Sequence, residues 1–424
     1  RAETFLSYRN CKVVYMHEEQ ANAMTPELSR ITIVTETYAP EVNGVAHTLA
    51  TLVSGMRARG IEVQIIRPRQ NKHDHGDEYS LTLPGLPIPG YPELKFGLPY
   101  YRRVLSALKN FNPQAIYVAT EGPLGWAACK AAEKLGTGVV SGFHTNFHQY
   151  GKHYRLGLIE NLGYRYMRWF HNNTAATLVP TQAQADELNS HGFERVSVMA
   201  RGVNSEQFSP EHRNQELRAS WGVNDDTPVL LYVGRIAAEK NLQLVVRTYE
   251  ELKNQDNSIR LVLVGDGPEL ESIRQRHPEI ICAGIRRGEE LSRYYASGDI
   301  FLFPSLTDTF GNVVTEALAS QLGVVSFDYA AAHEHTQDED SAMLPPFGDE
   351  QAFIRAALSL SERPNLLKHI RKNARDIAQG ISWDSIISEF LQHLAAAQTE
   401  VTSNGHSEAA RSKSRVSIPQ SGSL

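Results

Sequence analysis

The stretch PVLLYVGRIAAEKNLQLVVRTYEELKNQDNSIRLVLVGDG, residues 228–267, decides the fold of this chain. It begins and ends with short apolar runs rich in β-branched residues, at 228–236 and 259–267, which are typical of buried parallel strands. Between them, residues 241–255 place apolar side chains at helical spacing. A strand, a helix and a strand in this order predict a right-handed βαβ unit in a parallel sheet that is covered on both faces.

The same alternation extends in both directions along the chain. Further strands are predicted at 31–36, 61–68, 115–120, 138–145, 176–181, 299–305 and 324–328, and helices at 44–60, 124–136, 182–192, 268–277 and 315–323. The apolar periodicity stops at residues 201–211, where polar and turn-forming residues collect, and then restarts. The sequence therefore predicts an α/β protein with two doubly wound domains.

The predicted boundaries follow from these breaks. We expect a flexible N-terminal extension at 1–28, a first domain at 29–205, a second domain at 206–383, a C-terminal helix at 384–398 and a tail at 399–424. The tail is Ser-rich and lacks aromatic residues, so we expect it to be disordered. Residues 82–103 are rich in proline and glycine, which predicts a long shaped loop that is either functional or packed as a surface insertion.

The bulk composition excludes several classes of protein. The 42 lysines and arginines are outnumbered by 48 aspartates and glutamates, a net charge of −6 at pH 7, which argues against a nucleic-acid-binding protein. The three cysteines lie far apart without a CxxC spacing, as expected in a reducing cytosol. There is no apolar run of about 18 residues and no signal-peptide core. The expected location is cytoplasmic, for a protein that is neither exported nor membrane-spanning.

Several predicted strands are followed by polar residues, and in open α/β sheets ligands bind beyond the carboxyl ends of the strands. Gly44 opens the helix after the first strand, where a glycine lets backbone N–H groups approach an anion, although such a glycine is usually only part of a turn. Arg235 lies at the end of the predicted strand at 228–236 and Lys240 on the loop that follows it, so both are at the mouth of the second domain. These two cations could neutralise a diphosphate leaving group; the alternative is that they are solvated surface charges.

The motif TDTFGNVVTEALA, residues 307–319, shares this edge of the second domain. Its turn and helix start comprise Phe310, Gly311, Asn312 and Val313. The amides at the start of that helix would form an anion site. Glu316 lies one turn inside, where its carboxylate could accept hydrogen bonds from ribose hydroxyls, and Asp308 lies before the turn, towards the sugar. The alternative is that both acids only interact with the helix dipole.

Five motifs together resemble one enzyme family. They are YAPEVNGVAHTL at 38–49, GFHTNF at 142–147, VGRIAAEKNL at 233–242, LVGDGP at 263–268 and TDTFGNVVTEALA at 307–319. In this order and at these distances they resemble the retaining glycosyltransferases of family 4, which have the GT-B fold of two Rossmann-like domains facing across a cleft. The resemblance implies a nucleoside-diphosphate sugar donor held mainly by the C-terminal domain. It also implies an acceptor that enters from the N-terminal domain.

The resemblance also implies roles for individual residues. Arg235 and Lys240 match the family's diphosphate-binding pair, and Glu316 matches its ribose-binding glutamate. Gly44 matches the glycine that approaches the donor phosphate, and His144 matches a histidine that faces the reacting sugar. The implied catalytic residues are His144, Arg235, Lys240 and Asp308, and the implied substrate-binding residues are Gly44, Phe310, Gly311, Asn312, Val313 and Glu316.

Within the family, the motif at 307–319 and PGYPELKFGLP at 89–99 are most similar to a subgroup with bacterial α-mannosyltransferases and sulfoquinovosyl-diacylglycerol synthases. This implies transfer of a hexose, with GDP-mannose as the favoured donor, to a lipid or glycan hydroxyl. The first alternative is glucosyl, glucuronosyl or sulfoquinovosyl transfer from a UDP-sugar to diacylglycerol. An alternative of another class is a nucleotide-sugar epimerase or a non-catalytic sugar-nucleotide-binding protein. Asp308 stands where the family usually has glutamate, which leaves the donor sugar open.

The family's chemistry implies front-face substitution, in which the departing phosphate takes the acceptor proton while Arg235, Lys240 and the helix amides hold the forming charge. No cofactor, no obligatory metal and no nucleic-acid partner are expected. Residues 152–173 interleave basic and aromatic side chains. We expect this helix either to lie on anionic lipid at the inner face of the cytoplasmic membrane or to bury its aromatic side in the core.

Overall fold

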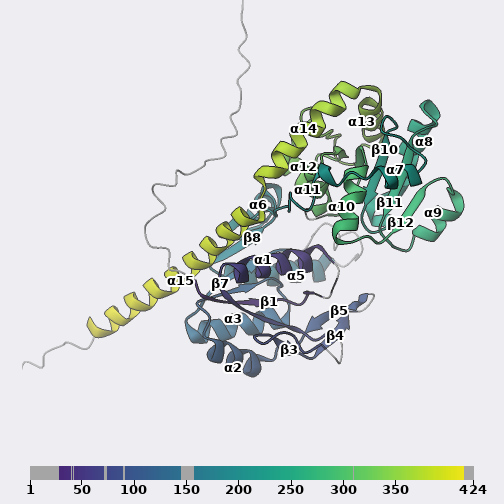
Figure 1. Ribbon diagram of the computed structural model, residues 1–424. Helices are drawn as coiled ribbons and strands as arrows, with labels where there is room; N and C mark the ends of the chain where they lie inside the picture. The colour runs from purple at the N-terminus through teal and green to yellow at the C-terminus, as the bar shows by residue number, and fades with distance from the viewer. Residues whose placement is uncertain are drawn as a thin grey trace, which may run out of the picture.

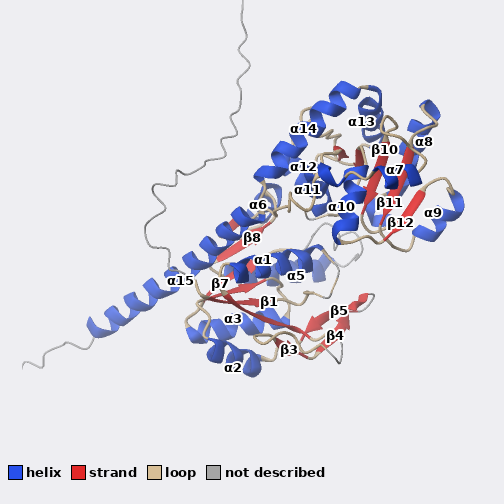
Figure 2. Ribbon diagram, in the orientation of Figure 1, coloured by secondary structure: helices blue, strands red, loops and turns tan. Residues whose placement is uncertain are grey.

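The computed structural model describes residues 28–39, 41, 43–70, 74–88, 91–144, 157–308 and 310–414. Within these ranges, only the backbone is described for residues 88, 91–94, 157–161 and 402–414. Of the predicted N-terminal extension, all but residue 28 lies outside these ranges. The described chain forms two α/β halves, each built around its own parallel sheet (Figures 1 and 2). The predicted fold class is therefore confirmed.

The first half contains a seven-stranded sheet in the order β3-β2-β1-β6-β7-β8-β9, in which all neighbouring strands are parallel. Its strands are β1 (Arg30–Val34), β2 (Glu62–Pro68), β3 (Leu81–Leu83), β6 (Ala115–Val118), β7 (Gly138–Gly142), β8 (Ala176–Val179) and β9 (Val196–Val198). The helices are α1 (Gly44–Ala58), α2 (Tyr101–Phe111), α3 (Pro123–Leu135), α5 (Gly157–Asn172) and α6 (Gln182–Ser190). Successive strand residues face opposite cores: Ile33 packs with Leu49 of α1, whereas Val34 packs with Leu124 of α3.

The second half contains a five-stranded parallel sheet in the order β12-β11-β10-β13-β14. Its strands are β10 (Val229–Val233), β11 (Arg260–Val264), β12 (Ile281–Gly284), β13 (Ile300–Phe303) and β14 (Gly323–Ser326). The helices are η1 (Pro210–His212), α7 (Gln215–Ser220), η2 (Ala238–Lys240), α8 (Leu242–Gln255), α9 (Leu270–Arg276), α10 (Gly288–Ser297), α11 (Asn312–Ala319), α12 (Ala330–His335), α13 (Glu350–Glu362) and α14 (Pro364–Gly380). Every residue of the central strands β10 and β13 is buried, as expected for a parallel sheet covered on both faces.

The last helix, α15 (Trp383–Ser414), returns to the first half and extends away from it (Figure 1). The ring centroids of Phe390 and Tyr117 are 4.9 Å apart, and the Gly138 amide donates to Gln398 Oε1 at 3.1 Å. The prediction of a helix that ends at 398 and a disordered tail from 399 is wrong as far as Ser414. Residues 399–414 contain no proline and carry several strong helix formers such as Glu and Ala, so the helix continues beyond its packed part.

The predicted loop at 82–103 is also corrected. It contains the end of β3, an antiparallel hairpin of β4 (Gly85–Ile88) and β5 (Tyr91–Gly97), and the start of α2. Proline argued against strands here because it cannot donate to a sheet. In a two-stranded sheet both strands are edge strands. A proline is tolerated there when its nitrogen faces the unpaired side of the strand, where no hydrogen bond is lost.

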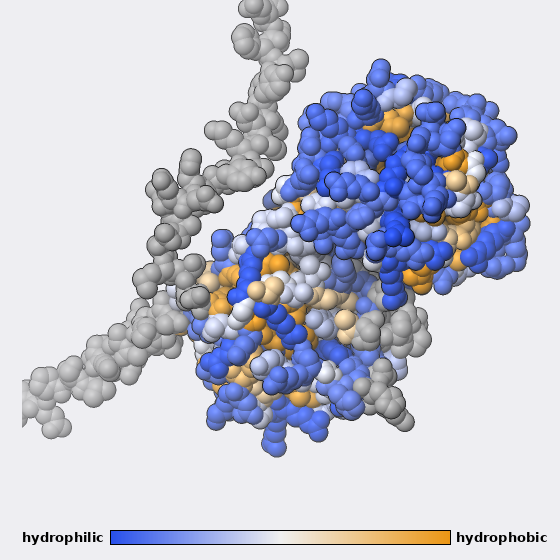
Figure 3. Space-filling view, viewed as in Figure 1, coloured by the Kyte–Doolittle hydropathy of each residue, from blue (hydrophilic) through white to orange (hydrophobic). Residues whose placement is uncertain are grey.

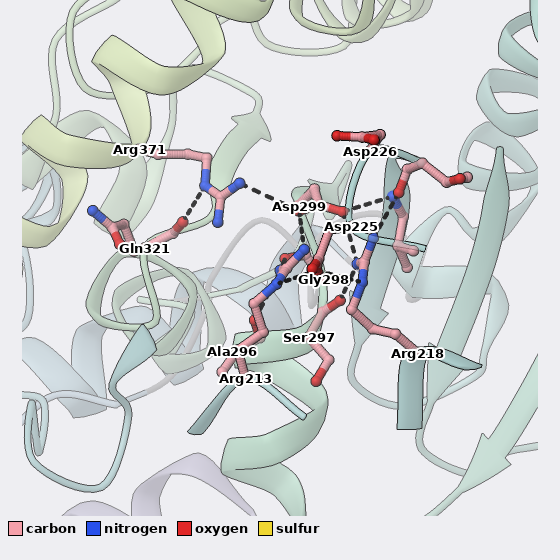
Figure 4. Close-up of polar contacts among 12 residues, drawn as sticks. Arg213, Arg218, Asp225, Asp226, Ala296, Ser297, Gly298, Asp299, Gln321 and Arg371 are labelled. Atoms are coloured by element: carbon pink, nitrogen blue, oxygen red, sulfur yellow. Dashed lines mark hydrogen bonds and ion pairs between the residues drawn. The ribbon is translucent and has the colours of Figure 1, made fainter. Parts of the chain in front are cut away.

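A buried charge cluster fixes the second half at the end of its sheet opposite the strand carboxyl ends (Figure 4). Asp299, which directly precedes β13, accepts from Arg218 at 3.0 Å, from Arg213 at 3.1 Å and from Arg371 at 3.2 Å. The Arg218 side chain is fully buried. Since each arginine comes from a different segment, Asp299 joins the residue after η1, helix α7 and helix α14 to the sheet.

The outer surface on the face viewed in Figure 3 is mostly hydrophilic, with hydrophobic residues in smaller patches. In the part of the chain that the structure describes, no helix is both long and apolar enough to cross a bilayer. Apolar side chains are instead concentrated in one core in the second half and on the two faces of the sheet in the first.

Candidate active site between the two halves

The loop after β10 packs directly on the loop after β11. A Cβ added to Gly265 would lie 1.9 Å from the Gly234 carbonyl oxygen, and one added to Gly267 would lie 2.3 Å from the Ile236 oxygen. The Ile236 amide donates to the Asp266 carbonyl at 2.9 Å. Glycine is therefore required at both positions of the GDG sequence, and it holds the loop that carries Arg235 in place.

Lys240 and Asp308, predicted to face different parts of the donor, are partners in the structure. The Lys240 Nζ lies 2.9 Å from each Asp308 carboxylate oxygen. The two side chains are 19% and 22% exposed, so the pair is partly shielded from water. Thr307 Oγ1 also donates to the Glu239 carbonyl at 3.2 Å. These contacts tie the loop after β10 to the loop after β13 and place a cation and an acid at the carboxyl edge of the sheet.

Arg235 has a more open setting than Lys240. Its side chain is 55% exposed and pairs with Glu239 at 3.2 Å. An exposed ion pair contributes at most about 1 kcal/mol to stability. Arg235 can therefore exchange Glu239 for an anionic ligand at little cost.

Helix α11 starts from a glycine that its backbone requires. Gly311 has a φ of 90° and precedes the first helical residue, Asn312. The sequence places Gly311 in the turn and the helix start close to Val313, so the start is predicted to within one residue. Phe310 is only 1% exposed and lies in the core of the second half. The Phe310 ring therefore anchors the turn from inside the core. No described side chain caps this helix end, so its first amides are available to an anion.

Glu316 is held one turn inside α11 by a tyrosine that the sequence did not single out. The Tyr295 hydroxyl of α10 donates to Glu316 Oε2 at 2.7 Å, and Tyr295 itself is fully buried. Burial raises the pKa of Glu316 to about 7, against the lowering effect of the Tyr295 hydrogen bond. The carboxylate keeps one oxygen free of Tyr295, as a clamp for two neighbouring hydroxyls requires.

The first half contributes Gly44 and His144. Asn43 caps α1 by accepting from the Ala46 amide at 2.8 Å, so Gly44 is the first helical residue. His144 follows β7, and its Nε2 lies 3.0 Å from the Tyr117 hydroxyl. Its Nδ1 is buried and has no hydrogen-bond partner among the described residues. Burial, helped by the Arg201 charge, lowers the pKa of His144 to about 3, so the ring is neutral at physiological pH and offers Nδ1 to a ligand.

Arg201 is a site residue that the sequence analysis missed. It follows β9 and lies in the 201–211 segment, where the loss of periodicity indicated only a joint. In the structure its Nη1 donates to Asn312 Oδ1 at 3.4 Å, and its guanidinium carbon lies 5.6 Å from the centre of the Phe310 ring. The only sequence signal was its charge at the end of a strand. The structure thus brings residues of both halves together around the start of α11.

The chain matches two family models. The model described as Glycosyltransferase Family 4 covers residues 42–207, and the one described as Glycosyl transferases group 1 covers residues 227–363. Each match falls on one of the two α/β halves.

Curated relatives align over most of the chain. A GDP-mannose-dependent alpha-mannosyltransferase of Mycobacterium tuberculosis is 30% identical over 379 residues, which cover 87% of this chain and 96% of that protein. The sulfoquinovosyl transferase SQD2 of Arabidopsis thaliana is 29% identical over 81% of this chain and 68% of its own length. An alpha-monoglucosyldiacylglycerol synthase of Streptococcus pneumoniae is 26% identical over 70% of both proteins.

Solved structures share the architecture at lower identity. Anabaena Alr3699/HepE in complex with UDP and glucose superposes with a TM-score of 0.68 over 87% of this chain and 100% of that one, at 17% identity. Sucrose-phosphate synthase from Thermosynechococcus elongatus gives a TM-score of 0.67 over 86% and 98%, also at 17% identity. These likenesses confirm the predicted GT-B fold. With the two family matches and the extended identity to the mannosyltransferase, they establish that the chain is a member of glycosyltransferase family 4.

Proposed function

We propose that this enzyme transfers a hexose from GDP-mannose to a hydroxyl group of a lipid or glycan, with retention of configuration. The observation that carries the proposal is the surroundings of α11. Along the chain, its first amides lie between Asp308, which pairs with Lys240, and Glu316, which Tyr295 holds. That order suits a diphosphate with a sugar on one side and a ribose on the other. The names of the relatives aligned over the greatest length support mannose as the sugar.

The proposed step is a front-face substitution. The bond from the anomeric carbon to the β-phosphate oxygen breaks, and the acceptor oxygen bonds to the same face of that carbon. The departing phosphate oxygen takes the proton of the acceptor hydroxyl. Lys240, Arg235 and the α11 amides stabilise the charge that develops on the phosphate.

A double displacement would require a carboxylate nucleophile close to the anomeric carbon. The carboxylates of the 307–319 motif already have partners, since Asp308 accepts from Lys240 through both oxygens and Glu316 accepts from Tyr295. His144, which is neutral, is suited to donate from Nδ1 to a sugar hydroxyl. These contacts favour the front-face route.

We further propose that catalysis needs no obligatory metal. Lys240 and Arg235 supply positive charge where a metal ion would otherwise bind the diphosphate. Among the described residues, no group of three or more His, Cys, Asp or Glu side chains is placed to hold a metal ion. We expect the rate of the wild-type protein to be unchanged in EDTA.

Binding of sugar nucleotides distinguishes the candidate functions. We expect GDP-mannose to raise the melting temperature of the protein more than UDP-glucose, UDP-glucuronate or UDP-sulfoquinovose at equal concentration, since a ligand at 100 times its Kd adds about 2.7 kcal/mol to stability. The measurement is a thermal-shift panel of these four donors, with free mannose as the control.

Results other than a larger shift with GDP-mannose would favour one of the alternative functions. A larger shift with a UDP-sugar would contradict the GDP-mannose assignment and favour a diacylglycerol glycosyltransferase. Epimerised sugar nucleotide after incubation without acceptor would favour an epimerase. Binding with no transfer to any lipid or glycan acceptor would favour a binding protein.

We also propose that α5 contacts anionic membrane, which would bring a lipid acceptor to the site. Within the described side chains of this helix, Leu162, Tyr166 and Trp169 are 67%, 39% and 46% exposed. Their spacing of four and three places them on one stripe, and Arg165 is exposed beside them. Phe170 instead is buried, so the structure divides the aromatic residues between core and surface. Residues 152–156 of the predicted segment lie outside the described residues.

Flotation tests this contact. We expect the protein to float with vesicles that contain phosphatidylglycerol and to stay behind with pure phosphatidylcholine. The double variant Leu162→Ser/Trp169→Ser should lose most of the binding because it removes the exposed apolar stripe. Trp126→Ser, a change at an exposed tryptophan of α3, is the matched control. Wild-type protein that never floats would argue for an acceptor taken from solution.

A further inference from the structure

Arg201 reaches from the first half to the start of α11 in the second. It is 4% exposed. Its Nη1 lies 3.4 Å from Asn312 Oδ1, and its guanidinium lies over the Phe310 ring. A residue that belongs to one half is thus buried against the helix end of the other.

Among the described residues, no carboxylate forms an ion pair with Arg201. No described Asp or Glu lies within 4.0 Å of its guanidinium, and its Nη2 is buried without a hydrogen-bond partner in the described chain. Burial lowers the pKa of Arg201 to about 10, against the attraction of Tyr117 and Asp308. Asp308 already binds Lys240 through both oxygens. A buried cation without a partner destabilises the folded protein, so we infer that this position is suited to receive an anion.

Two helix N-termini face the same guanidinium. A Cβ added to Gly44, the first residue of the 15-residue helix α1, would lie 3.5 Å from Arg201 Nη1. Asn312, which Arg201 contacts, is the first residue of the eight-residue helix α11, whose start has no side-chain cap. Helix N-termini attract anions through their free amides and their dipoles. The unpartnered Nη2 and the two helix ends therefore point to one anionic ligand.

The contrast with Arg218 shows what a structural arginine needs in this protein. Arg218 is also buried, but it binds the Asp299 carboxylate at 3.0 Å and the carbonyls of Ser297 and Thr227 at 2.7 and 2.8 Å. Arg201 makes one long bond to an amide oxygen instead. The contacts of Arg218 explain its burial by a structural role. The contacts of Arg201 do not explain why a charged side chain is buried there.

We propose that Arg201 binds the terminal phosphate of a nucleoside diphosphate between the starts of α1 and α11, as a third cation beside Lys240 and Arg235. This rests on the proposed function and extends it, because the first half then completes the donor site. The same contact strengthens as the sugar leaves and charge accumulates on that phosphate. Arg201 is therefore expected to affect both donor binding and turnover.

The test compares nucleotides with and without the terminal phosphate. We expect Arg201→Gln to weaken GDP about 10- to 100-fold, the range for a charge-assisted hydrogen bond. GMP binding should change little, so the variant loses its preference for GDP over GMP. Arg201→Lys should recover part of that preference, because it keeps the charge without the planar fork. Isothermal titration calorimetry gives each Kd.

The controls separate binding from folding. Arg195→Gln, at an arginine near the start of β9 whose Nε bonds the Thr174 carbonyl, should leave both Kd values unchanged. Since Arg201 lacks a protein partner for its charge, Arg201→Gln should keep or raise the melting temperature of the ligand-free protein. A lower melting temperature together with equal losses for GDP and GMP would show a structural role and overturn the proposal. An unchanged GDP preference in folded Arg201→Gln and Arg201→Lys would overturn it as well.

A wrong donor assignment can be distinguished from a wrong role for Arg201. If wild-type protein binds UDP in place of GDP, the donor assignment fails and the UDP to UMP comparison tests Arg201 in the same way. If it binds no nucleotide, inorganic pyrophosphate is the probe. Pyrophosphate binding that Arg201→Gln abolishes would support the anion site without the donor. Equal pyrophosphate binding by both proteins, or none by either, would overturn it.

Discussion

Lys240→Ala is expected to lower kcat by about 10²- to 10³-fold, the usual cost of removing one group that stabilises a developing oxyanion. The loss should exceed any change in KM, because the charge on the departing phosphate is greatest in the transition state. Steady-state kinetics with the donor identified by thermal shift provide the measurement. Lys253→Ala is the matched control, since Lys253 pairs with Glu279 away from the site.

The partner of Lys240 makes a sharper test possible. If Lys240 served only to hold Asp308, then Asp308→Ala alone would cost as much as Lys240→Ala and the double variant would cost no more. If Lys240 acts on the phosphate, the double variant should be slower than Asp308→Ala. A wild-type rate that is lost in EDTA and restored by Mg²⁺ or Mn²⁺ would contradict the proposal that protein cations replace a metal.

Glu316→Gln is expected to weaken donor binding about 10- to 100-fold at pH 8, because an amide accepts only through its one oxygen where the carboxylate accepts through two. The pKa of Glu316 is raised to about 7, so wild-type donor affinity should also fall as the pH drops below 7. The variant should show a flatter pH profile. Donor Kd values from pH 5.5 to 8.5 test this, with Glu290→Gln, at a surface pair with Arg286, as the control.

Glu316→Gln, which should weaken donor binding, should stabilise the ligand-free protein at pH 8. A carboxyl group whose pKa is about 7 when folded and near 4.5 when unfolded binds more protons in the folded state between these values. Its contribution to stability is therefore lost as the pH rises from about 4.5 to 7. Glu316→Gln should raise the melting temperature at pH 8 and change it little at pH 4.5. Burial raises the pKa of Glu36 to about 7 in the same way, so the wild-type pH dependence should be reduced in the variant without being abolished. A lower melting temperature at pH 8 would contradict this account.

The sequence predicted β1, β2, β6, β7, β8, β10, β11, β13 and β14 in their observed order, because each depends on spacing within about 5 to 15 neighbouring residues. It did not predict the short strands β9 and β12 or the helices α2, α10, α13 and α14. It located Gly44, Gly311 and the carboxyl edge of each sheet, since a glycine turn before a helix is a local feature. Two predicted segments were wrong because the surrounding structure outweighed the local sequence pattern. Residues 82–103 contain a hairpin although they are rich in proline, and α15 continues to Ser414 where the prediction ended it at 398.

Only the tertiary structure decided which site residues are partners. Lys240 and Asp308 are 68 positions apart, Tyr295 and Glu316 are 21, and Arg201 and Asn312 are 111. Spacing along the chain predicts contacts only within one helix or hairpin, and none of these pairs lies within either. Burial, which raises the pKa of Glu316 and leaves Arg201 without a counter-charge, likewise depends on what packs around a residue. The sequence thus predicts a phosphate site, and the packing of the two halves shows that Lys240 and Arg235 have acidic partners whereas Nη2 of Arg201 has no hydrogen-bond partner among the described residues.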